Sequence, residues 1–473
     1  MQLARRTWLA SALGGLGGLA VARLLAEEAQ QPRPEYNGGL HHPARARRII
    51  QVFLNGGMSQ VDTFDYKPEL IKRHGQTVDV GLKATATSTP GPVMKSPFAW
   101  KQHGQCGRWV TEVFPCLARH VDEMAFLMAM QARTNVHGPA SYLQNTGFLL
   151  PGFPCAGAWI SYALGRLTDN LPTFVVLPDA RGLPYNGAGN FSAGFLPAAH
   201  QGTVIDPSAA APIPDLAPAP QGTFVTPSAS AAGMELLQEM NRRYAAQRPG
   251  DSRLESRIES YEIAAKMQLA APEAFDLRRE SKIVHDLYGT EEPAPNGPFA
   301  RNCLLARRLI ERGVRFVQIW SGAGGASNNW DNHTNIQTEL PPIARQVDRP
   351  VAALLTDLRT RGLAEDTLVI FTTEFGRMPF TQGSVGRDHN GGTFVTWLAG
   401  AGVKGGVAHG ASDELGYQAV RDRTTVHDMY ATVLHLLGID HERLTVRHNG
   451  IDRRLTDVHG HLIEPILAHP PSG

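Results

Sequence analysis

The C-terminal half of the chain alternates apolar runs with amphipathic segments, and this alternation constrains the fold more than any other feature. Residues 314–320, 366–373 and 393–402 are short apolar runs, and residues 343–362 and 426–439 have helical periodicity. Short connections separate these segments, which is typical of strands and helices that alternate in a mostly parallel sheet. The pattern predicts an α/β fold, a three-layer sandwich with helices on both faces of the sheet.

The N-terminal half adds strands and an irregular insertion. Residues 49–54 are apolar and end in Asn55-Gly56-Gly57, which is typical of a buried strand that ends in a turn. Further strand candidates lie at 120–130 and 171–179. Residues 201–233 are rich in Pro, Ala and Ser, and helical periodicity returns at 234–247 and 252–271. We therefore expect a single domain over residues 48–473 with an irregular and helical insertion at about 185–300.

Residues 1–26 have the features of an export signal. Arg5 and Arg6 are followed by Trp8, Leu9 and a short apolar run rich in Gly and Ala. This predicts a twin-arginine signal peptide, with residues 27–47 as a linker, and a plain secretory signal or a short anchor is the alternative. No other stretch reaches the ~18 uninterrupted apolar residues that a membrane span needs. We expect an exported protein, periplasmic or extracellular, without a membrane segment beyond the signal.

Composition excludes some classes of function. The formal net charge of +1 argues against a dedicated nucleic-acid surface, which needs a clustered excess of Lys and Arg. The four cysteines form no CxxC pair, so no thiolate zinc site is expected. Cys106 and Cys116 are the nearest pair in sequence for a disulfide, and isolated buried thiols are the alternative.

Acidic and imidazole side chains gather where the predicted strands end. Asp331 and His333 follow the strand at 314–320, Glu374 follows the strand at 366–373, and His389 precedes the strand at 393–402. In parallel sheets, ligands bind beyond the carboxyl ends of the strands. Carboxylate oxygens and imidazole nitrogens suit a divalent metal such as Zn or Mn, and all-oxygen sites suit Ca. A shared metal site is therefore predicted, although each pair alone also fits a surface hydrogen bond.

The first strand adds further polar candidates. Asn55 emerges directly from it, and Asp62 and Asp65 follow in the loop. Asp62 is a candidate metal ligand or a helix cap, and Asp65 a candidate ligand or the residue before a Lys67-Pro68 turn.

Two arginines flank the acidic residues near Glu374. Arg377 and Arg387 are candidate groups for gripping a phosphate or sulfate oxygen. The alternative is that they only neutralise Glu374 and Asp388.

Taken together, the motifs resemble a known group of enzymes. The segments "GGMSQVDTFDYKP", "WDNH", "DTLVIFTTEFGR" and "GRDHN" look like those of the alkaline phosphatase and sulfatase superfamily. The closer resemblance is to an exported sulfatase-like family, domain of unknown function 1501, and it covers roughly residues 48–440. It implies a hydrolase of phosphate or sulfate esters, with a small molecule or polysaccharide as substrate and a divalent metal ion (Zn, Mn or Ca) as cofactor.

The resemblance also implies roles for individual residues. Asp331, His333 and His389 resemble the first metal site of the superfamily. The second site departs from the pattern, since Glu374 replaces an Asp, Phe375 replaces a His and Asn55 replaces the Asp of the first strand. A second metal would then need Asp62 or Asp65 to compensate.

The nucleophile departs from the pattern as well. The segment "HGPASYLQNTG", residues 137–147, matches in length the sulfatase stretch that carries a Cys or Ser matured to formylglycine, and His137 stands at the nucleophile position. His137 is a candidate metal ligand, phosphoryl acceptor or proton acceptor, and also a candidate for a buried hydrogen-bonded imidazole. Thr134 and Ser141 are nearby hydroxyl alternatives.

Three hypotheses follow. The first is an exported metal-dependent ester hydrolase in which His137, Arg377 and Arg387 are the catalytic groups. The second is a noncatalytic member of the same fold that binds an anion or an anionic polysaccharide. A phosphomutase or transferase is the third, and export argues against it because those chemistries usually act on cytosolic metabolites.

Overall fold

A central sheet of eight strands organises the molecule. The computed structural model describes residues 40–79, 81, 90–207, 226–248, 258 and 273–469. The strands lie in the order β12-β4-β11-β8-β1-β7-β5-β6. Their bounds are β1 (Arg48–Leu54), β4 (Met124–Met130), β5 (Phe174–Leu177), β6 (Thr203–Val204), β7 (Phe316–Ser321), β8 (Thr367–Thr373), β11 (Phe394–Gly400) and β12 (Val407–His409).

Most of the strand pairs are parallel, which confirms the predicted fold class. β1 lies between β7 and β8 and is parallel to both, and β5 is parallel to β7 and β6. β11 is the exception, because it runs antiparallel to both of its neighbours, β4 and β8. The carboxyl ends of β1, β5, β7 and β8 therefore meet at one edge of the sheet, where a site is expected.

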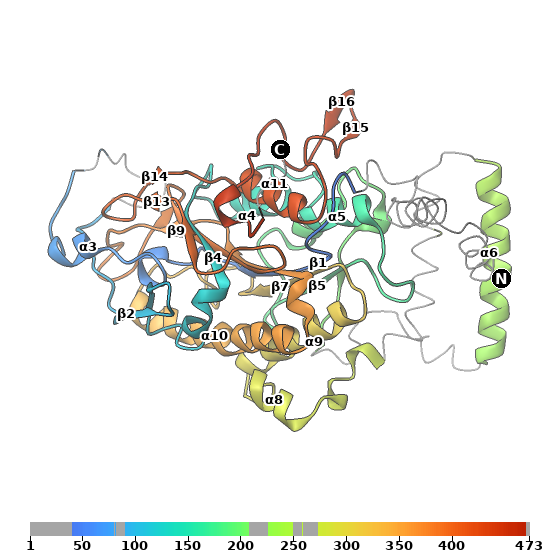
Figure 1. The fold of residues 1–473 in the computed structure, drawn as a ribbon, viewed down its shortest axis with the longest axis horizontal. Coiled ribbons are helices and arrows are strands. Elements are labelled where there is room, and N and C mark those ends of the chain that lie inside the picture. Colours follow the sequence, from blue (N-terminus) through green and yellow to red (C-terminus); the bar gives the residue numbers. More distant parts are fainter. Residues whose placement is uncertain are drawn as a thin grey trace, which may run out of the picture.

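Helices cover both faces of this sheet (Figure 1). On one face, α9 (Asn296–Glu311) and α10 (Ile336–Thr360) pack in one core cluster with every second strand residue, such as Ile50 and Val52. On the other face, α4 (His137–Thr146), α5 (Ala156–Leu164) and α11 (Val426–Leu436) pack with the alternate residues, such as Ile49 and Phe53. Side chains alternate between the faces along a strand, so fully apolar strands fit a sheet that is covered twice.

Helix α10 shows how the sequence builds these layers. Val347, Val351, Leu354 and Leu358 recur every three or four residues and are all buried, as an apolar stripe facing a sheet must be. The helix begins at Ile336, earlier than the predicted 343, because the side chain of Asn335 accepts the backbone N–H of Gln337 and caps it. The predicted strand at 120–130 is likewise shorter, since Leu117–Glu123 forms a 3-10 helix.

Smaller elements surround the sandwich. The short helices are α3 (Pro68–Lys72) and α8 (Lys282–Tyr288), and α6 (Pro227–Ala246) lies within the predicted insertion. Four two-stranded ribbons complete the fold: β2 (Trp100–His103) with β3 (Arg108–Thr111), β9 (Gly376–Arg377) with β10 (His389–Asn390), β13 (Ala411–Ser412) with β14 (Ala419–Arg421), and β15 (Val446–His448) with β16 (Ile451–Arg453).

Several sequence-based expectations lie wholly or partly outside the described residues. These are the signal peptide at 1–26, most of the linker at 27–47 and most of the helical segment at 252–271. Among the described residues, no helix is long and apolar enough to cross a membrane.

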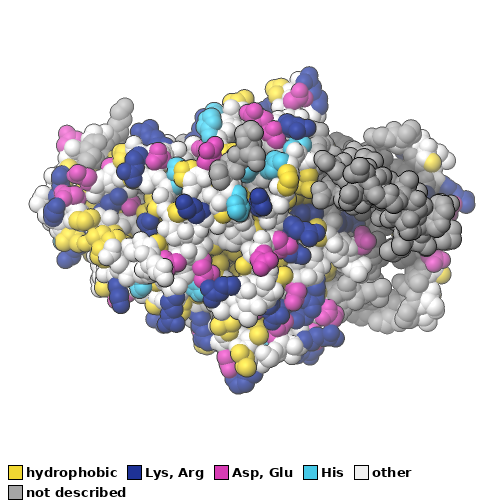
Figure 2. Space-filling model, viewed as in Figure 1, with side chains coloured by type: hydrophobic (Ala, Val, Ile, Leu, Met, Phe, Trp, Pro, Cys, Tyr) yellow, Lys and Arg dark blue, Asp and Glu magenta, His cyan; other side chains and the backbone are white. Residues whose placement is uncertain are grey.

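The sequence led to expectations about the state of the cysteines and the distribution of surface charge. All four cysteines are free, so Cys106 and Cys116 do not form the disulfide that was one alternative. Only Cys155 and Cys303 are fully buried thiols. Figure 2 shows Lys and Arg mixed with Asp and Glu over one face of the molecule, in keeping with the net charge of +1.

Candidate metal centre

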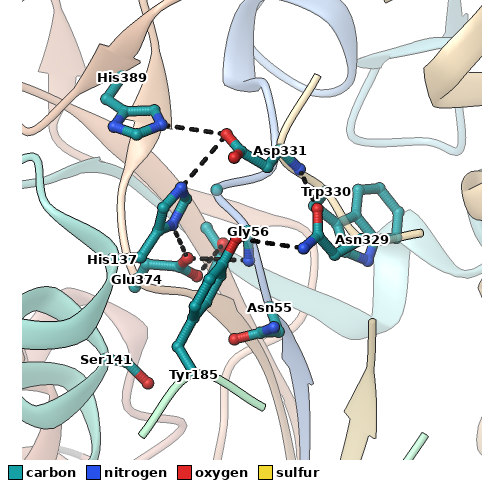
Figure 3. Close-up of polar contacts among 12 residues, drawn as sticks. Asn55, Gly56, His137, Ser141, Tyr185, Asn329, Trp330, Asp331, Glu374 and His389 are labelled. Carbon is teal, nitrogen blue, oxygen red and sulfur yellow. Dashed lines mark hydrogen bonds and ion pairs between the residues drawn. The ribbon is translucent and has the colours of Figure 1, made fainter. Parts of the chain in front are cut away.

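Four side chains from three parts of the chain converge at the carboxyl edge of the sheet. Asp331 and His333 lie between β7 and α10, His389 begins β10, and His137 is the first residue of α4. One ligand atom from each of the four lies within 4.8 Å of the others. Figure 3 shows His137 and His389 pointing at the carboxylate of Asp331. The structure thus brings together the three residues predicted for the first metal site and adds His137.

A single oxygen lies at the centre of this cluster. Asp331 Oδ1 is 2.7 Å from Nε2 of His333, 3.0 Å from Nε2 of His389 and 3.2 Å from Nε2 of His137. The Nε2 atoms of His333 and His389 are 2.7 Å apart. These distances place three ring nitrogens around one carboxylate oxygen.

The other nitrogen of each ring faces an oxygen acceptor. Nδ1 of His137 lies 2.8 Å from Oε1 of Glu374, and Nδ1 of His389 lies 2.8 Å from the carbonyl oxygen of Asn135. Nδ1 of His333 contacts Oε1 of Gln382. Since these oxygens accept hydrogen bonds, a proton on each Nδ1 satisfies them and leaves Nε2 of each ring to face the cluster.

This arrangement fits a bound metal cation. Lone pairs that face a carboxylate oxygen at about 3 Å repel it unless a positive charge lies among them. Metal-binding histidines usually donate their second ring nitrogen to a carboxylate, a carbonyl or an amide, as all three do here. Three imidazole nitrogens and one carboxylate oxygen form a donor set suited to Zn or Mn and poorly suited to Ca, which prefers oxygen ligands.

Burial and charge move the pKa values of the cluster in different directions. Burial lowers the pKa of His389 to about 4, and Arg377 contributes to that shift. Burial alone would raise the pKa of Asp331, but its contacts with the three histidines and the charge of Arg377 hold that pKa well below the usual range. Burial alone would lower the pKa of His137, but the adjacent carboxylates of Asp331 and Glu374 raise it.

Glu374 and Asn55 lie beside the cluster at the ends of two neighbouring strands. Glu374 follows β8 and is buried, and its Oε1 accepts the backbone N–H of Gly56 at 2.8 Å as well as the contact with His137. Asn55 follows β1 and donates its side-chain N–H to the carbonyl of Ala323. Its Oδ1 is buried and has no hydrogen-bond partner in the described part of the chain. Glu374 is therefore in contact with His137, whereas Asn55 lies beside Gly56 and makes no hydrogen bond with the described residues of the cluster (Figure 3).

Phe375 forms an apolar wall next to these groups. Its ring is fully buried and lies 4.9 Å from the ring of His137 and 4.8 Å from that of His389, measured between centroids. Gly57 permits this packing, because its φ is +81° and a Cβ there would lie 2.7 Å from the Phe375 ring. Phe375 cannot ligate a metal, so on this side the cluster is bounded by carbon atoms.

Arg377 supports the Asp331 carboxylate from within the protein. Its Nη2 lies 2.6 Å from Asp331 Oδ1, and its Nε donates to the carbonyl oxygen of Gly57 at 2.8 Å. Further contacts from its two Nη atoms reach the carbonyl oxygens of Gly56, Trp330 and Arg387. The guanidinium is fully buried and its donors are engaged, so this arrangement favours a positioning role for Arg377.

Arg387 lies against Asp62 instead of the cluster. Its Nε contacts Asp62 Oδ2 at 2.5 Å and its Nη2 donates to Asp62 Oδ1 at 3.1 Å. Both side chains are fully buried, and Arg387 also donates to the carbonyl oxygens of Met378 and Met94. The structure therefore does not bring Asp62 or Arg387 into the site. It agrees with the alternative that the arginines neutralise carboxylates, but the partners are Asp331 and Asp62, not Glu374 and Asp388.

The remaining candidates are engaged elsewhere. Asp65 pairs with Lys67 at 3.1 Å and accepts a hydrogen bond from Ser412, while Pro68 begins α3. Ser141 donates to Asn190 at 2.9 Å, and Thr134 accepts the backbone N–H of Val136. None of these contacts joins the four-residue cluster.

Most of the chain matches a defined protein family. Residues 46–467 match the family described as "Protein of unknown function (DUF1501)". The chain belongs to this family. No curated protein matches the sequence of this DUF1501 protein.

Three solved structures with low similarity to the DUF1501 protein belong to named types of protein. The lipoteichoic acid synthase LtaP from Listeria monocytogenes is 8% identical, with 85% of this chain and 76% of that chain covered and a TM-score of 0.38. The PsFucS1 sulfatase from Pseudoalteromonas sp. is 13% identical, with 95% and 77% covered and a TM-score of 0.32. The alkaline phosphatase from the Antarctic bacterium TAB5 is 9% identical, with 84% and 98% covered and a TM-score of 0.34. These TM-scores are low, so the family assignment rests on the match over residues 46–467.

Some residues of this DUF1501 site were not expected from the sequence. The ring of Tyr185 stacks on His137 at 4.5 Å, and its hydroxyl accepts a hydrogen bond from Asn329. Burial and the nearby carboxylates raise the pKa of Tyr185 to about 12. Asn329 lies in the "SNNWDNH" segment that also holds Asp331 and His333, and this proximity could have pointed to it. No sequence pattern pointed to Tyr185 or Gln382.

Proposed function

We propose that this protein is a metal-dependent hydrolase of phosphate or sulfate esters. The observation that carries the proposal is the convergence of three Nε2 atoms on Asp331 Oδ1, each with its Nδ1 held by an oxygen acceptor. In such a site Asp331, His333 and His389 hold the metal. His137 has the longest of the three contacts, and we assign it to the reacting side of the centre.

The metal and the protein contribute different parts of the chemistry. A bound divalent metal polarises an ester oxygen and lowers the pKa of water toward neutrality, to about 7 in zinc sites. Glu374 holds Nδ1 of His137 and so orients Nε2 toward the cluster, where it gives or takes a proton at the ester oxygen or the water. His137 also begins α4, whose amino end favours the negative charge that develops on the ester.

Water as the attacking group agrees with the contacts of the site. None of the four cysteines opens a formylglycine motif, and the Ser141 hydroxyl is buried against Asn190. The preference for phosphate and sulfate esters is supported by the resemblance of the motifs around Asp331, Glu374 and His389. We further propose that the paired Arg5 and Arg6 direct export, so that the enzyme acts outside the cytoplasm.

Two observations favour a second candidate, a noncatalytic protein that binds an anion or an anionic polysaccharide. Phe375 stands where a further metal ligand would be needed. The guanidinium groups of Arg377 and Arg387 are also engaged with Asp331 and Asp62, so neither is available to a transition-state oxyanion.

Turnover of small chromogenic esters distinguishes the two candidates. The purified protein is stripped of metal with a chelator, reloaded with Zn or Mn, and assayed with 4-nitrophenyl phosphate and 4-nitrophenyl sulfate. We expect hydrolysis of one ester that depends on the added metal and is lost in His333→Ala. A protein that binds metal and anionic polysaccharide tightly but hydrolyses neither ester supports the second candidate.

A further inference from the structure

A polar pocket adjoins the metal centre on the side of Asp331. Its volume is about 390 Å³, and its lining includes Arg181, Asn332, Glu339 and Gln346 as well as Asp331 itself. We call it the Glu339 pocket. Pockets of a few hundred Å³ hold small ligands, and because Asp331 lines both, a molecule in this pocket lies next to the metal centre.

The floor of the Glu339 pocket is built at the ends of two strands. Asp179 follows β5, and its Oδ2 accepts the backbone N–H of Gly322, which follows β7, and the side-chain N–H of Gln346 from α10. Arg181 is clamped on the same carboxylate by its Nε and Nη2 at 2.7 Å each. This network fixes the wall in place before any ligand arrives.

Two residues that line the pocket each carry a buried acceptor atom without a partner in the described part of the chain. Asn332 is only 3% exposed, and its Oδ1 is buried with no hydrogen-bond partner in the described part of the chain. The same is true of Oε2 of Glu339. Buried polar atoms are almost always satisfied, so two unpaired acceptors in the wall of one pocket are places where a ligand can supply donors.

The position of Glu339 in its helix does not account for its orientation. It lies in the first turn of α10, where a carboxylate is favoured by the helix dipole. A carboxylate exposed to solvent would gain the same stabilisation from the helix dipole, yet Oε2 of Glu339 is buried. No ion pair joins Glu339 to a described Lys or Arg. An ion pair within the described residues therefore does not explain the orientation of its carboxylate either.

We propose that the Glu339 pocket binds the alcohol portion of the ester, and that this portion is a polyhydroxylated sugar ring. The proposal rests on the proposed hydrolase function. Glu339 and Asn332 offer acceptors, and Arg181 offers a donor, because its Nη1 takes no part in the contacts with Asp179 and Gln346. A hydroxyl group both donates and accepts, so a ring with several hydroxyls matches this mixed lining better than an aryl group.

The test compares esters with and without hydroxyls on the alcohol. Wild type and Glu339→Gln are assayed with a hexose phosphate and phenyl phosphate, and with a hexose sulfate and phenyl sulfate. We expect the ratio of kcat/KM for the hexose ester to that for the phenyl ester to fall about tenfold or more in Glu339→Gln, the loss of a hydrogen bond to a charged group. Glu339→Asp, which keeps the charge, should recover part of the ratio, and the exposed Glu365→Gln should leave it unchanged.

Two results would overturn the proposal. One is a ratio that stays within twofold of wild type in Glu339→Gln variants that fold and retain metal. The other is a preference of wild type for an aminoalkyl ester over the hexose ester, which would make the pocket a cation site.

A binding measurement tests the sugar site separately from the hydrolase activity. If no ester is hydrolysed, calorimetry with the hexose phosphate still tests the pocket. Binding by wild type that weakens about tenfold in Glu339→Gln keeps the sugar site while the hydrolase proposal fails. Absence of binding to both proteins removes the sugar site as well.

Discussion

His333 and His389 face each other through their Nε2 atoms at 2.7 Å, while both atoms also contact Asp331 Oδ1. Each ring uses its Nδ1 proton elsewhere, on Gln382 and on Asn135. With the proton on Nδ1, neither Nε2 has a proton to donate across that contact. A cation that receives both lone pairs explains the contact.

His137 should affect turnover more than metal content. In His137→Ala we expect the metal to remain and the rate of ester hydrolysis to fall by about 10²–10⁴-fold, the usual contribution of a positioned acid or base. Metal content and kcat are measured on the same preparation. Loss of the metal together with the activity would instead make His137 a ligand.

Arg377 should affect the affinity for metal. It holds Asp331 Oδ1 at 2.6 Å from inside the protein, and loss of such a supporting contact typically weakens metal binding about 10–100-fold. Competition with a chromogenic chelator measures this for Arg377→Met, with Arg377→Lys expected to lie between that variant and wild type. If metal affinity is unchanged and only KM for the ester rises, Arg377 contacts the substrate as the sequence suggested.

The pair of Asp62 and Arg387 should affect stability. Both groups are fully buried, so Asp62→Asn leaves an uncompensated guanidinium and should lower the free energy of unfolding by about 3–5 kcal/mol. Urea denaturation measures this change. Asp286→Asn removes the exposed pair with Lys282 and should cost less than about 1 kcal/mol. A loss of metal without a loss of stability in Asp62→Asn would contradict the structural role.

The place of the candidate site was predictable because its residues are tied to strand ends. Asp331, Glu374 and Asn55 each follow an apolar run, and parallel strands bring their carboxyl ends to one edge. The sequence therefore indicated which segments meet there. The resemblance to the sulfatase-like family pointed to the same residues.

The partners of the buried charges were not predictable in the same way. Arg377 and Arg387 are close to Glu374 and Asp388 in sequence, yet they pair with Asp331 and Asp62, which follow β7 and β1. The Glu339 pocket also depends on contacts between distant elements, since Asp179 and Gln346 are joined only in the folded chain. The pattern of neighbouring residues in the sequence does not predict contacts between side chains that are far apart along the chain.

His200 should make the protein less stable in acid. Burial lowers its pKa from 6.5 to about 4, and Arg166 adds to the effect. The folded state therefore favours the neutral ring, so its contribution is fully present above pH 6.5 and is lost as the pH falls toward 4. The difference corresponds to at most about 3 kcal/mol. Thermal unfolding between pH 7.5 and 4.5 should show a weaker pH dependence in His200→Gln and an unchanged one in His461→Gln, whose side chain is exposed. Equal slopes in all three proteins would contradict this reasoning.

The metal content of the purified protein tests the central claim most directly. Elemental analysis of wild type, Asp331→Ala, His389→Ala and the control His461→Ala should show a stoichiometric divalent metal in wild type and control. The same metal should be absent from the two site variants, while their circular dichroism remains that of wild type. Sub-stoichiometric metal in wild type, or metal that is indifferent to both site substitutions, would contradict the claim that Asp331, His333 and His389 form a metal centre.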